Sequence, residues 1–368
     1  MALIKVNTRG QSSDFSSGRN FHNRIINGDM RIRQRNITTS TINGAGVTYN
    51  VDRWLGRGAG SAGVFTLVQD SESPNGFTKS LKATVTTADS SIAAGSSYRV
   101  MQHVEGYNMN DLGWGSSSAQ NVMLSFWVRS SVTGTFGGSF ANGDYNRFRT
   151  FSYTISSANT WEKKTVSISG DTSGSWSYSA DLGIRLNFSI GAGSSKVGST
   201  GAWGTSSIEG ATGQANLIST NNATFYLTGV KLEAGTTATD FESRQFGDEL
   251  LLCQRYYYQL GGTSGYSMIC PCFGASTQEL AMLVKFPVDM RQTPAVSWES
   301  NSTLTFRRMN NGSHDWTPNG VNAMTTGELR NYGGAIWFGG FNHGQSQYAA
   351  GHVRVANGSN SLRFDAEI

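Results

Sequence analysis

The chain has 368 residues, of which 15% are charged, 45 are glycine and only 5 are proline, and its formal net charge is +4. This length predicts two domains, each large enough to bury a hydrophobic core. The 19 phenylalanines, 13 tyrosines and 9 tryptophans exclude a disordered low-complexity chain, and the small, scattered positive charge excludes a nucleic-acid-binding surface.

Residues 1–23 are polar and rich in glycine and serine, with too little apolar area to offset the entropy of ordering. Two interpretations are open, a frayed terminus or a peptide that becomes ordered when it docks on a partner. No apolar run near Met1 is long enough for a signal peptide or a membrane span. We therefore expect neither signal-directed export nor membrane insertion.

Short runs of alternating polar and apolar residues, separated by turns such as Asn75-Gly76 and Asn142-Gly143, fill residues 24–247. The predicted strands span residues 64–68, 80–85, 98–104, 122–128, 163–168 and 182–188. Many short alternating strands predict two stacked antiparallel sheets, and a jelly-roll β-sandwich would limit exposed edges. Residues 191–223 form a predicted long loop, and the basic run 31–35 is predicted as the exposed face of a strand or as a contact with an acidic partner.

Residues 248–368 are predicted to form a smaller C-terminal β-sandwich. One or two helical turns are expected at 249–255, followed by strands at 280–287, 295–298, 335–338, 349–355 and 362–368. No heptad repeat is present, so a coiled coil is not expected. The predicted fold class is therefore all-β.

Aromatic residues in turn-rich loops are the candidates for binding a sugar, because a flat ring covers the apolar face of a pyranose and nearby amides or carboxylates bind its hydroxyls. The alternative interpretation is a ring folded back over the sheet edge. In the first domain the candidates are Trp114, Tyr107, Asn108, Asp111, Trp176 and Trp203. In the second domain they are Asp315, Trp316, Asn319, His343 and Tyr348.

No pattern of catalytic residues is present. The five histidines have no metal-ligand spacing, and no nucleophile elbow accompanies them. A pair of carboxylates could still cleave a polysaccharide, with Asp70 and Glu72 or Asp144 and Glu162 as the pairs to consider. Surface acids at turns are the simpler interpretation, and we predict that the chain is not an enzyme.

The three cysteines, Cys253, Cys270 and Cys272, are too few for a disulfide framework and lack the spacing of a zinc site. They are predicted to be free thiols in a protein assembled in a reducing compartment. No cofactor is expected, although acids at turns would permit a structural calcium ion.

Several blocks in order resemble one family of proteins. They are RIINGDM at 24–30, YNVDRW at 49–54, LSFWVRS at 124–130, NTWEK at 159–163, TGVKLEAGTTATDFESR at 228–244 and ELLLCQRYYY at 249–258. Together they resemble the tail fibres and virion appendages of tailed bacteriophages, with their carbohydrate-binding-module-like jelly-roll domain. The resemblance covers roughly residues 20–260.

This resemblance implies a receptor-binding tail fibre or spike that adsorbs to host surface polysaccharide without catalysis. It implies a homotrimer that contacts other virion proteins of the tail, neck or head. It also implies assembly in the host cytoplasm and a final location in the virion. Residues 1–23, with Leu3, Ile4, Val6, Arg9 and Phe15, would attach to the virion, and residues 248–368 would form the tip. A capsid decoration, collar or neck protein and a polysaccharide-degrading tailspike are the two alternatives.

Overall fold

The computed structural model describes residues 23–60, 62–261, 268–274, 276, 279–298, 304–308, 315–316, 323–339, 350–355 and 361–368. The predicted attachment residues Leu3, Ile4, Val6, Arg9 and Phe15 lie outside these residues, as do the sugar-site candidates Asn319, His343 and Tyr348. Asp315 and Trp316 form the short strand β21 (Asp315–Trp316), of which only the backbone is described.

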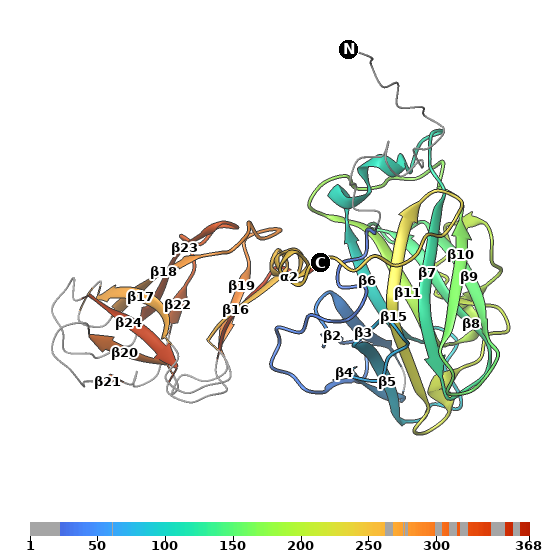
Figure 1. The fold of residues 1–368 in the computed structure, drawn as a ribbon, viewed down its shortest axis with the longest axis horizontal. Helices are drawn as coiled ribbons and strands as arrows, with labels where there is room; N and C mark the ends of the chain where they lie inside the picture. Colours follow the sequence, from blue (N-terminus) through green and yellow to red (C-terminus); the bar gives the residue numbers. More distant parts are fainter. Residues whose placement is uncertain are drawn as a thin grey trace, which may run out of the picture.

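Two antiparallel sheets form the larger body of the molecule, coloured blue to yellow in Figure 1. The six-stranded sheet, sheet A, has the order β1 (Ser40–Ile42), β4 (Val64–Asp70), β5 (Ser80–Thr87), β15 (Thr224–Ala234), β7 (Val122–Ser130) and β10 (Glu162–Ile168). The seven-stranded sheet, sheet B, has the order β13 (Trp203–Gly204), β9 (Phe148–Ile155), β8 (Gly134–Asn142), β11 (Leu182–Ala192), β6 (Ser97–Glu105), β3 (Trp54–Ala59) and β2 (Val47–Tyr49). The chain crosses between the two sheets from β5 to β6, from β6 to β7 and from β7 to β8, as in a jelly roll.

The core lies between the two sheets, because every second residue of each strand points inward. Its large rings are Trp54, Phe65, Phe126, Phe140 and Phe188, all fully buried. Short elements close the ends of the sandwich. They are the 3-10 helices η2 (Gly106–Leu112), η3 (Ser194–Lys196) and η4 (Leu217–Ser219), and the parallel pair β12 (Val197–Gly198) and β14 (Gly210–Ala211).

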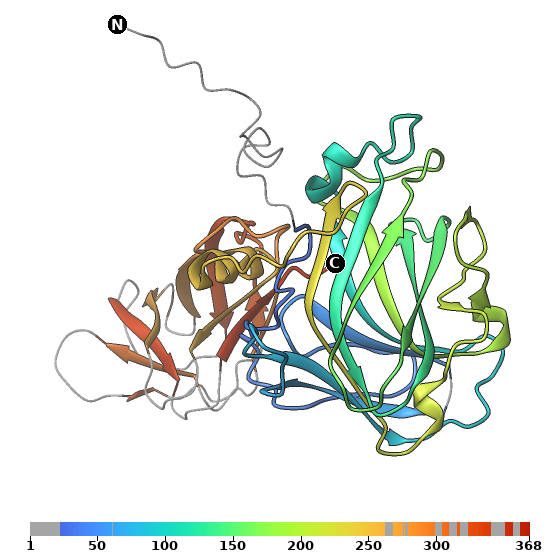
Figure 2. The same ribbon diagram turned by 45° about the vertical axis from the view of Figure 1, so that its right-hand side comes forward.

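The smaller C-terminal body, orange to red in Figures 1 and 2, has a separate core that includes Leu280, Met282, Ile336 and Phe364. Its three-stranded sheet has the order β16 (Tyr257–Gly261), β25 (Ser361–Asp365) and β19 (Ala295–Trp298). Its seven-stranded sheet has the order β21, β20 (Leu304–Arg308), β24 (Ala350–Val355), β17 (Met268–Gly274), β18 (Glu279–Lys285), β23 (Gly333–Gly339) and β22 (Ala323–Thr325). The prediction of an all-β fold with a second, smaller β-sandwich is confirmed.

The helix α2 (Phe246–Gln254) joins the two bodies and corresponds to the helical turns predicted near residue 249. Its buried Glu249 accepts a hydrogen bond from the backbone N–H of Asn27 at 2.5 Å and pairs with Arg244 at 3.1 Å. Asn27 in turn bonds through its side chain to the backbone of Ile32 and Asp52. Four of the six blocks quoted above, at 24–30, 49–54, 228–244 and 249–258, therefore meet at the junction of the two bodies.

Buried charges complete this junction. Arg53, 1% exposed, pairs with Glu367, and its guanidinium lies 3.5 Å from the centroid of the Tyr256 ring. Arg255 pairs with Glu105 at 2.5 Å. The two bodies are thus held by ion pairs that need precise placement of both partners.

The basic run at 31–35 differs from its prediction as an exposed strand face. Arg35 is only 6% exposed and lies between Asp52, at 3.4 Å, and the ring of Tyr257, whose centroid is 3.8 Å from the guanidinium. Ile32 is 2% exposed, and the segment is not a strand. The junction with the C-terminal body buries Arg35, whereas Arg33 is exposed, and sequence periodicity does not indicate that junction.

Candidate functional site

The three loop tryptophans of the first domain form one cluster at the edge of the sandwich. The ring centroids of Trp114, Trp176 and Trp203 lie 4.8 to 5.3 Å apart in edge-to-face contacts. Trp114 is 1% exposed and Trp176 is 6% exposed, and Trp203 is half-buried. The Trp114 and Trp176 rings therefore do not face solvent. They are folded back over the edge of the sheet, which was the alternative to a sugar-binding ring.

The indole N–H groups explain why this packing is stable. Trp114 donates to the backbone oxygen of Gln120 and Trp203 to that of Ser169, both at 2.8 Å. Each ring thus buries its apolar area without leaving a polar atom unpaired. The sequence showed the glycines beside these residues but not the distant strands that cover the rings.

The other three candidates of the first domain share one surface pocket. Tyr107, Asn108 and Asp111 all lie on η2, and the Tyr107 ring is 56% exposed. The pocket has a volume of about 470 Å³. It is lined by Asn23, Arg24, Ile26, Tyr107, Asn108, Asn110, Asp111, Arg244 and Leu252.

The helix η2 holds these side chains in place. Its buried Met109 and Leu112 anchor it to the core, and the backbone N–H of Gly106 donates to the backbone oxygen of Asp181 at 2.8 Å. A Cβ on Gly106 would lie 2.5 Å from the backbone oxygen of Ser177, so only glycine allows this close approach. The intervening positions, including Tyr107, then face solvent.

Charges in this pocket are paired. Arg24, with 8% of its side chain exposed, forms an ion pair with Asp111, which is 66% exposed. Arg244 is bound to Glu249 and to the backbone of Ile25. The pocket therefore presents an exposed ring, amide groups and a fixed arginine–carboxylate pair, which are the groups that bind a neutral polyhydroxylated ligand.

Sequence reasoning found the η2 residues but missed the opposite wall of this pocket. Asn23, Arg24 and Ile26 come from the start of the sandwich, and Arg244 and Leu252 come from the junction. The 23–26 and 244–252 segments are more than 200 residues apart along the chain, and no local pattern links either of them to η2.

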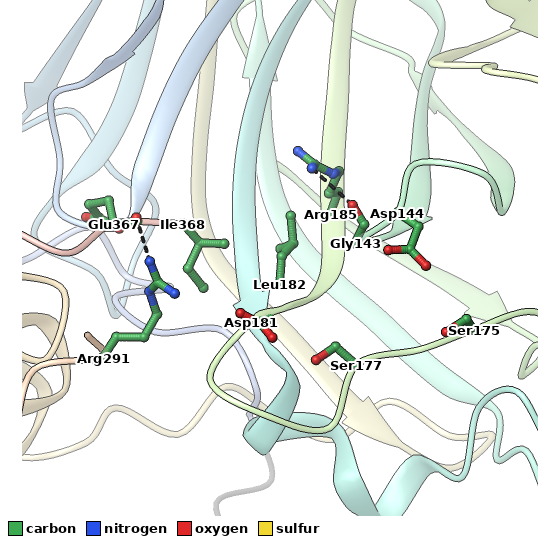
Figure 3. Close-up of a pocket in the computed structure, with 10 residues that line it drawn as sticks. All are labelled: Gly143, Asp144, Ser175, Ser177, Asp181, Leu182, Arg185, Arg291, Glu367 and Ile368. Atoms are coloured by element: carbon green, nitrogen blue, oxygen red, sulfur yellow. Dashed lines mark hydrogen bonds between the residues drawn. The ribbon is translucent and has the colours of Figure 1, made fainter. Parts of the chain in front are cut away.

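A second pocket, also of about 470 Å³, lies where the sandwich meets the C-terminal body (Figure 3). Arg291 donates to the backbone oxygens of Ala366, at 2.8 Å, and Glu367, at 3.1 Å. The pocket is lined by Gly143, Asp144, Ser175, Ser177, Asp181, Leu182, Arg185, Arg291, Glu367 and Ile368. Of these residues, only Asp144 was a candidate for a functional role from the sequence, as half of a carboxylate pair.

Three of the four carboxylates considered for catalysis, Asp70, Glu72 and Glu162, are engaged in surface contacts. Asp70 lies 3.4 Å from Lys82, and Glu72 lies 3.8 Å from Arg129. Glu162 pairs with Lys164 at 2.5 Å. Burial acts to raise the pKa of Glu162, but its hydrogen bonds from Lys164 and two backbone N–H groups outweigh burial and lower it.

The cysteines are unpaired and buried, as free thiols. Burial raises the pKa of Cys270 to about 11 and that of Cys272 to about 12, which makes both poor nucleophiles. Within the described ranges, no group of three or more His, Cys, Asp or Glu side chains is placed to hold a metal ion. In the same part of the chain, no helix has the length and apolar character needed to cross a bilayer.

No family model matches the chain, and no curated protein matches it. Among solved structures, it is similar to the enzymatically active domain of tailspike protein 4 from bacteriophage CBA120, with a TM-score of 0.32 and 13% identity over 58% of this chain and 22% of that chain. It thus spans under a quarter of that structure's length.

Two other similar structures are sugar-binding proteins by name. One is a putative sugar binding protein from Bacteroides thetaiotaomicron, with a TM-score of 0.31 and 13% identity over 58% of this chain and all of that chain. The other is the family 11 carbohydrate-binding module from Clostridium thermocellum, with a TM-score of 0.28 and 12% identity over 55% of this chain and 100% of that chain. At these scores the likeness assigns neither a ligand nor an activity to this chain.

Proposed function

We propose that this chain is a non-catalytic, glycan-binding structural protein of a virion appendage, a tail fibre or spike with which a tailed bacteriophage adsorbs to host surface polysaccharide. The glycan-binding part rests on one observation. The exposed ring of Tyr107 shares a single pocket with Asn108, Asn110 and the Arg24–Asp111 ion pair. The virion part rests on the ordered sequence blocks between residues 24 and 258.

The chemistry of the Tyr107 pocket supports a sugar ligand. A ring that is 56% exposed offers an apolar face to a pyranose, and the amides of Asn108 and Asn110 both donate and accept hydrogen bonds. Because Met109 and Leu112 fix η2 to the core, the site loses little freedom when a ligand binds.

The absence of catalysis is proposed because each carboxylate pair considered has at least one member held by a basic partner, although Asp144 itself is exposed. Asp70, Glu72 and Glu162 each have a basic partner, and the pKa of Glu162 lies below its usual value. A general acid for glycoside cleavage needs a raised pKa instead.

We further propose that the appendage is a homotrimer that contacts other virion proteins through residues 1–23. One shallow pocket gives modest affinity, on the order of millimolar to micromolar, and several copies on one particle would give avidity. The predicted C-terminal candidates Asp315, Trp316, Asn319, His343 and Tyr348 remain part of this proposal as a second contact at the tip.

The test uses fluorescently labelled full-length protein on a panel of bacterial strains and on their extracted polysaccharides. At least one strain should be labelled, and removal of its surface polysaccharide should abolish labelling. Tyr107→Ala should weaken binding about two- to tenfold, the range expected for one ring contact. Tyr332→Ala, at a tyrosine that is 53% exposed on the C-terminal body, is the matched control and should bind normally.

Three outcomes would contradict the proposal. Labelling of no strain would favour a capsid decoration or neck protein. Equal weakening of binding by Tyr107→Ala and Tyr332→Ala would show that binding does not depend on the Tyr107 pocket. Release of reducing ends from a bound polysaccharide would identify a tailspike enzyme instead.

A further inference from the structure

The outer face of sheet B carries three arginines on neighbouring strands. Arg57 on β3 lies opposite Arg99 on β6, and Arg185 on β11 lies opposite His103 on β6. Tyr98 and Val100, on either side of Arg99, and Ile184 and Leu186, on either side of Arg185, belong to the core, so alternation places these two arginines on the outer side. Arg57 lies directly opposite Arg99 in the antiparallel pair and therefore shares its side. We call Arg57, Arg99 and Arg185 the basic face.

Buried polar atoms without a hydrogen-bond partner gather on this face. They are the Nε atoms of the three arginines, Nε2 of His103 and Oδ1 of Asn187. Asn187 is fully buried and Arg99 is 1% exposed. Native proteins pair almost all such atoms with protein groups, water or a ligand, so a group of them in one place marks a candidate position for a bound ligand.

The unpaired atoms are of two kinds. The arginine Nε–H groups are charged donors. The Nδ1 of His103 donates to the backbone oxygen of Ile368 at 2.6 Å, which leaves Nε2 as an acceptor, and Asn187 donates through Nδ2 to Ser139 at 3.0 Å, which leaves Oδ1 as an acceptor. A ligand with an anionic group and hydroxyl groups would satisfy both kinds.

One carboxylate already shows how this face binds an acid. Glu209 reaches it from the loop between β13 and β14 and is 2% exposed. Its carboxylate lies 3.0 Å from Arg99 and 3.7 Å from Lys196, and it accepts hydrogen bonds from Ser97 and Tyr145. The face therefore holds a carboxylate with guanidinium, ammonium and hydroxyl donors.

The other two arginines have no such carboxylate within the described part of the chain, where neither Arg57 nor Arg185 forms an ion pair. Arg185 donates a hydrogen bond to the backbone oxygen of Gly143 at 3.2 Å. Burial lowers the pKa of Arg185, and the positive charges of Arg57 and Arg99 lower it further. The Tyr145 ring, 5.2 Å from the guanidinium of Arg185, is its aromatic neighbour.

The face can be reached from solvent. Arg57 and Arg185 are half-buried, and Arg185 lines the junction pocket shown in Figure 3. Of the acids in that pocket, Glu367 is neutralised by Arg53 and Arg35. Asp144 and Asp181 are exposed at its rim, where solvent and salt screen their charge.

We propose that Arg57 and Arg185, next to Tyr145, form a second binding site that takes the anionic group of a hydroxylated ligand, a sugar carboxylate or a phosphate. This site is distinct from the Tyr107 pocket. It extends the proposed function by naming an acidic component of the ligand. Arg99, His103 and Asn187 lie on the same face but are buried, so a ligand reaches Arg57 and Arg185 first.

The test measures binding of glucuronate, inorganic phosphate and glucose to the purified full-length protein by calorimetry and thermal shift. Glucuronate or phosphate should bind and raise the melting temperature, glucose should do neither at this site, and added salt should weaken binding. Arg185→Gln should weaken binding about tenfold or more, because a charge-assisted hydrogen bond is lost. Arg330→Gln, the same change at an exposed arginine of the C-terminal body, should bind as the natural chain does.

Binding of glucuronate but not phosphate would identify the source as an acidic sugar, and the reverse would identify a phosphate group. Binding of neither anion would overturn the proposal, as would equal weakening by Arg330→Gln. If Arg185→Gln does not fold, Arg57→Gln provides the same comparison. Because these probes are free small molecules, the result is independent of cell binding by the Tyr107 pocket.

Discussion

Replacement of Trp114 by alanine tests whether the tryptophan cluster belongs to the core. The ring is 1% exposed and makes edge-to-face contacts with Phe140, Trp176 and Trp203. Removing a buried tryptophan costs about 3–5 kcal/mol through lost burial and the cavity that remains. For a body of this size, each kcal/mol corresponds to roughly 2–4 °C, so the melting temperature should fall by about 6–20 °C.

Differential scanning calorimetry and urea unfolding of Trp114→Ala would measure this loss. Tyr107→Ala is the control, because its ring is 56% exposed and an exposed substitution should stay within about 0.5 kcal/mol. A fall of less than about 2 °C in Trp114→Ala would show that the ring does not stabilise the sandwich and would restore it as a candidate sugar contact.

Three further variants test the junction, a buried histidine and a close backbone approach. Arg53→Ala removes the buried partner of Glu367 and should lower the free energy of unfolding by about 3–5 kcal/mol. In calorimetry the C-terminal body should then melt in a separate transition at lower temperature. A single transition at the original temperature would refute this. Burial, with the positive charge of Arg185 nearby, lowers the pKa of His103 from 6.5 to about 3. As the pH falls, the unfolded chain therefore takes up a proton at this histidine before the folded chain does. The folded state should lose about 1.4 kcal/mol of stability per pH unit between about pH 6.5 and pH 3. His103→Gln should reduce that slope in urea unfolding, and an unchanged slope would contradict the assignment. Gly28→Ala should cost about 1–3 kcal/mol in the same assay, because a Cβ there would lie 2.2 Å from the backbone oxygen of Val230; an unchanged midpoint would argue against this contact.

Strand periodicity was sufficient to predict the fold class. The runs predicted at 64–68, 98–104 and 182–188 are β4, β6 and β11, because their alternation is fixed by the one buried face of each sheet. The predicted long loop at 191–223 instead contains β12, β13 and β14, which pair over only two residues each. Strands this short leave no periodic signal.

The candidate site was only partly predictable. Tyr107, Asn108 and Asp111 lie on one short helix, so their proximity in sequence carries over to the structure. The burial of Trp114 and Trp176 depends on strands far away in the sequence, as does the convergence of Arg57, Arg99 and Arg185. A charged residue at the outward position of a strand looks solvated until its neighbours across the sheet are known.

The junction has a consequence for recombination between proteins of this architecture. Arg53 belongs to the sandwich, whereas its counterion Glu367 and its stacking partner Tyr256 belong to the C-terminal body. A chimaera that replaces only the distal module would leave this guanidinium sequestered without a counterion. Crossovers that keep the fold are therefore expected to bring an equivalent tyrosine and glutamate with the new module, or to exchange Arg53 as well.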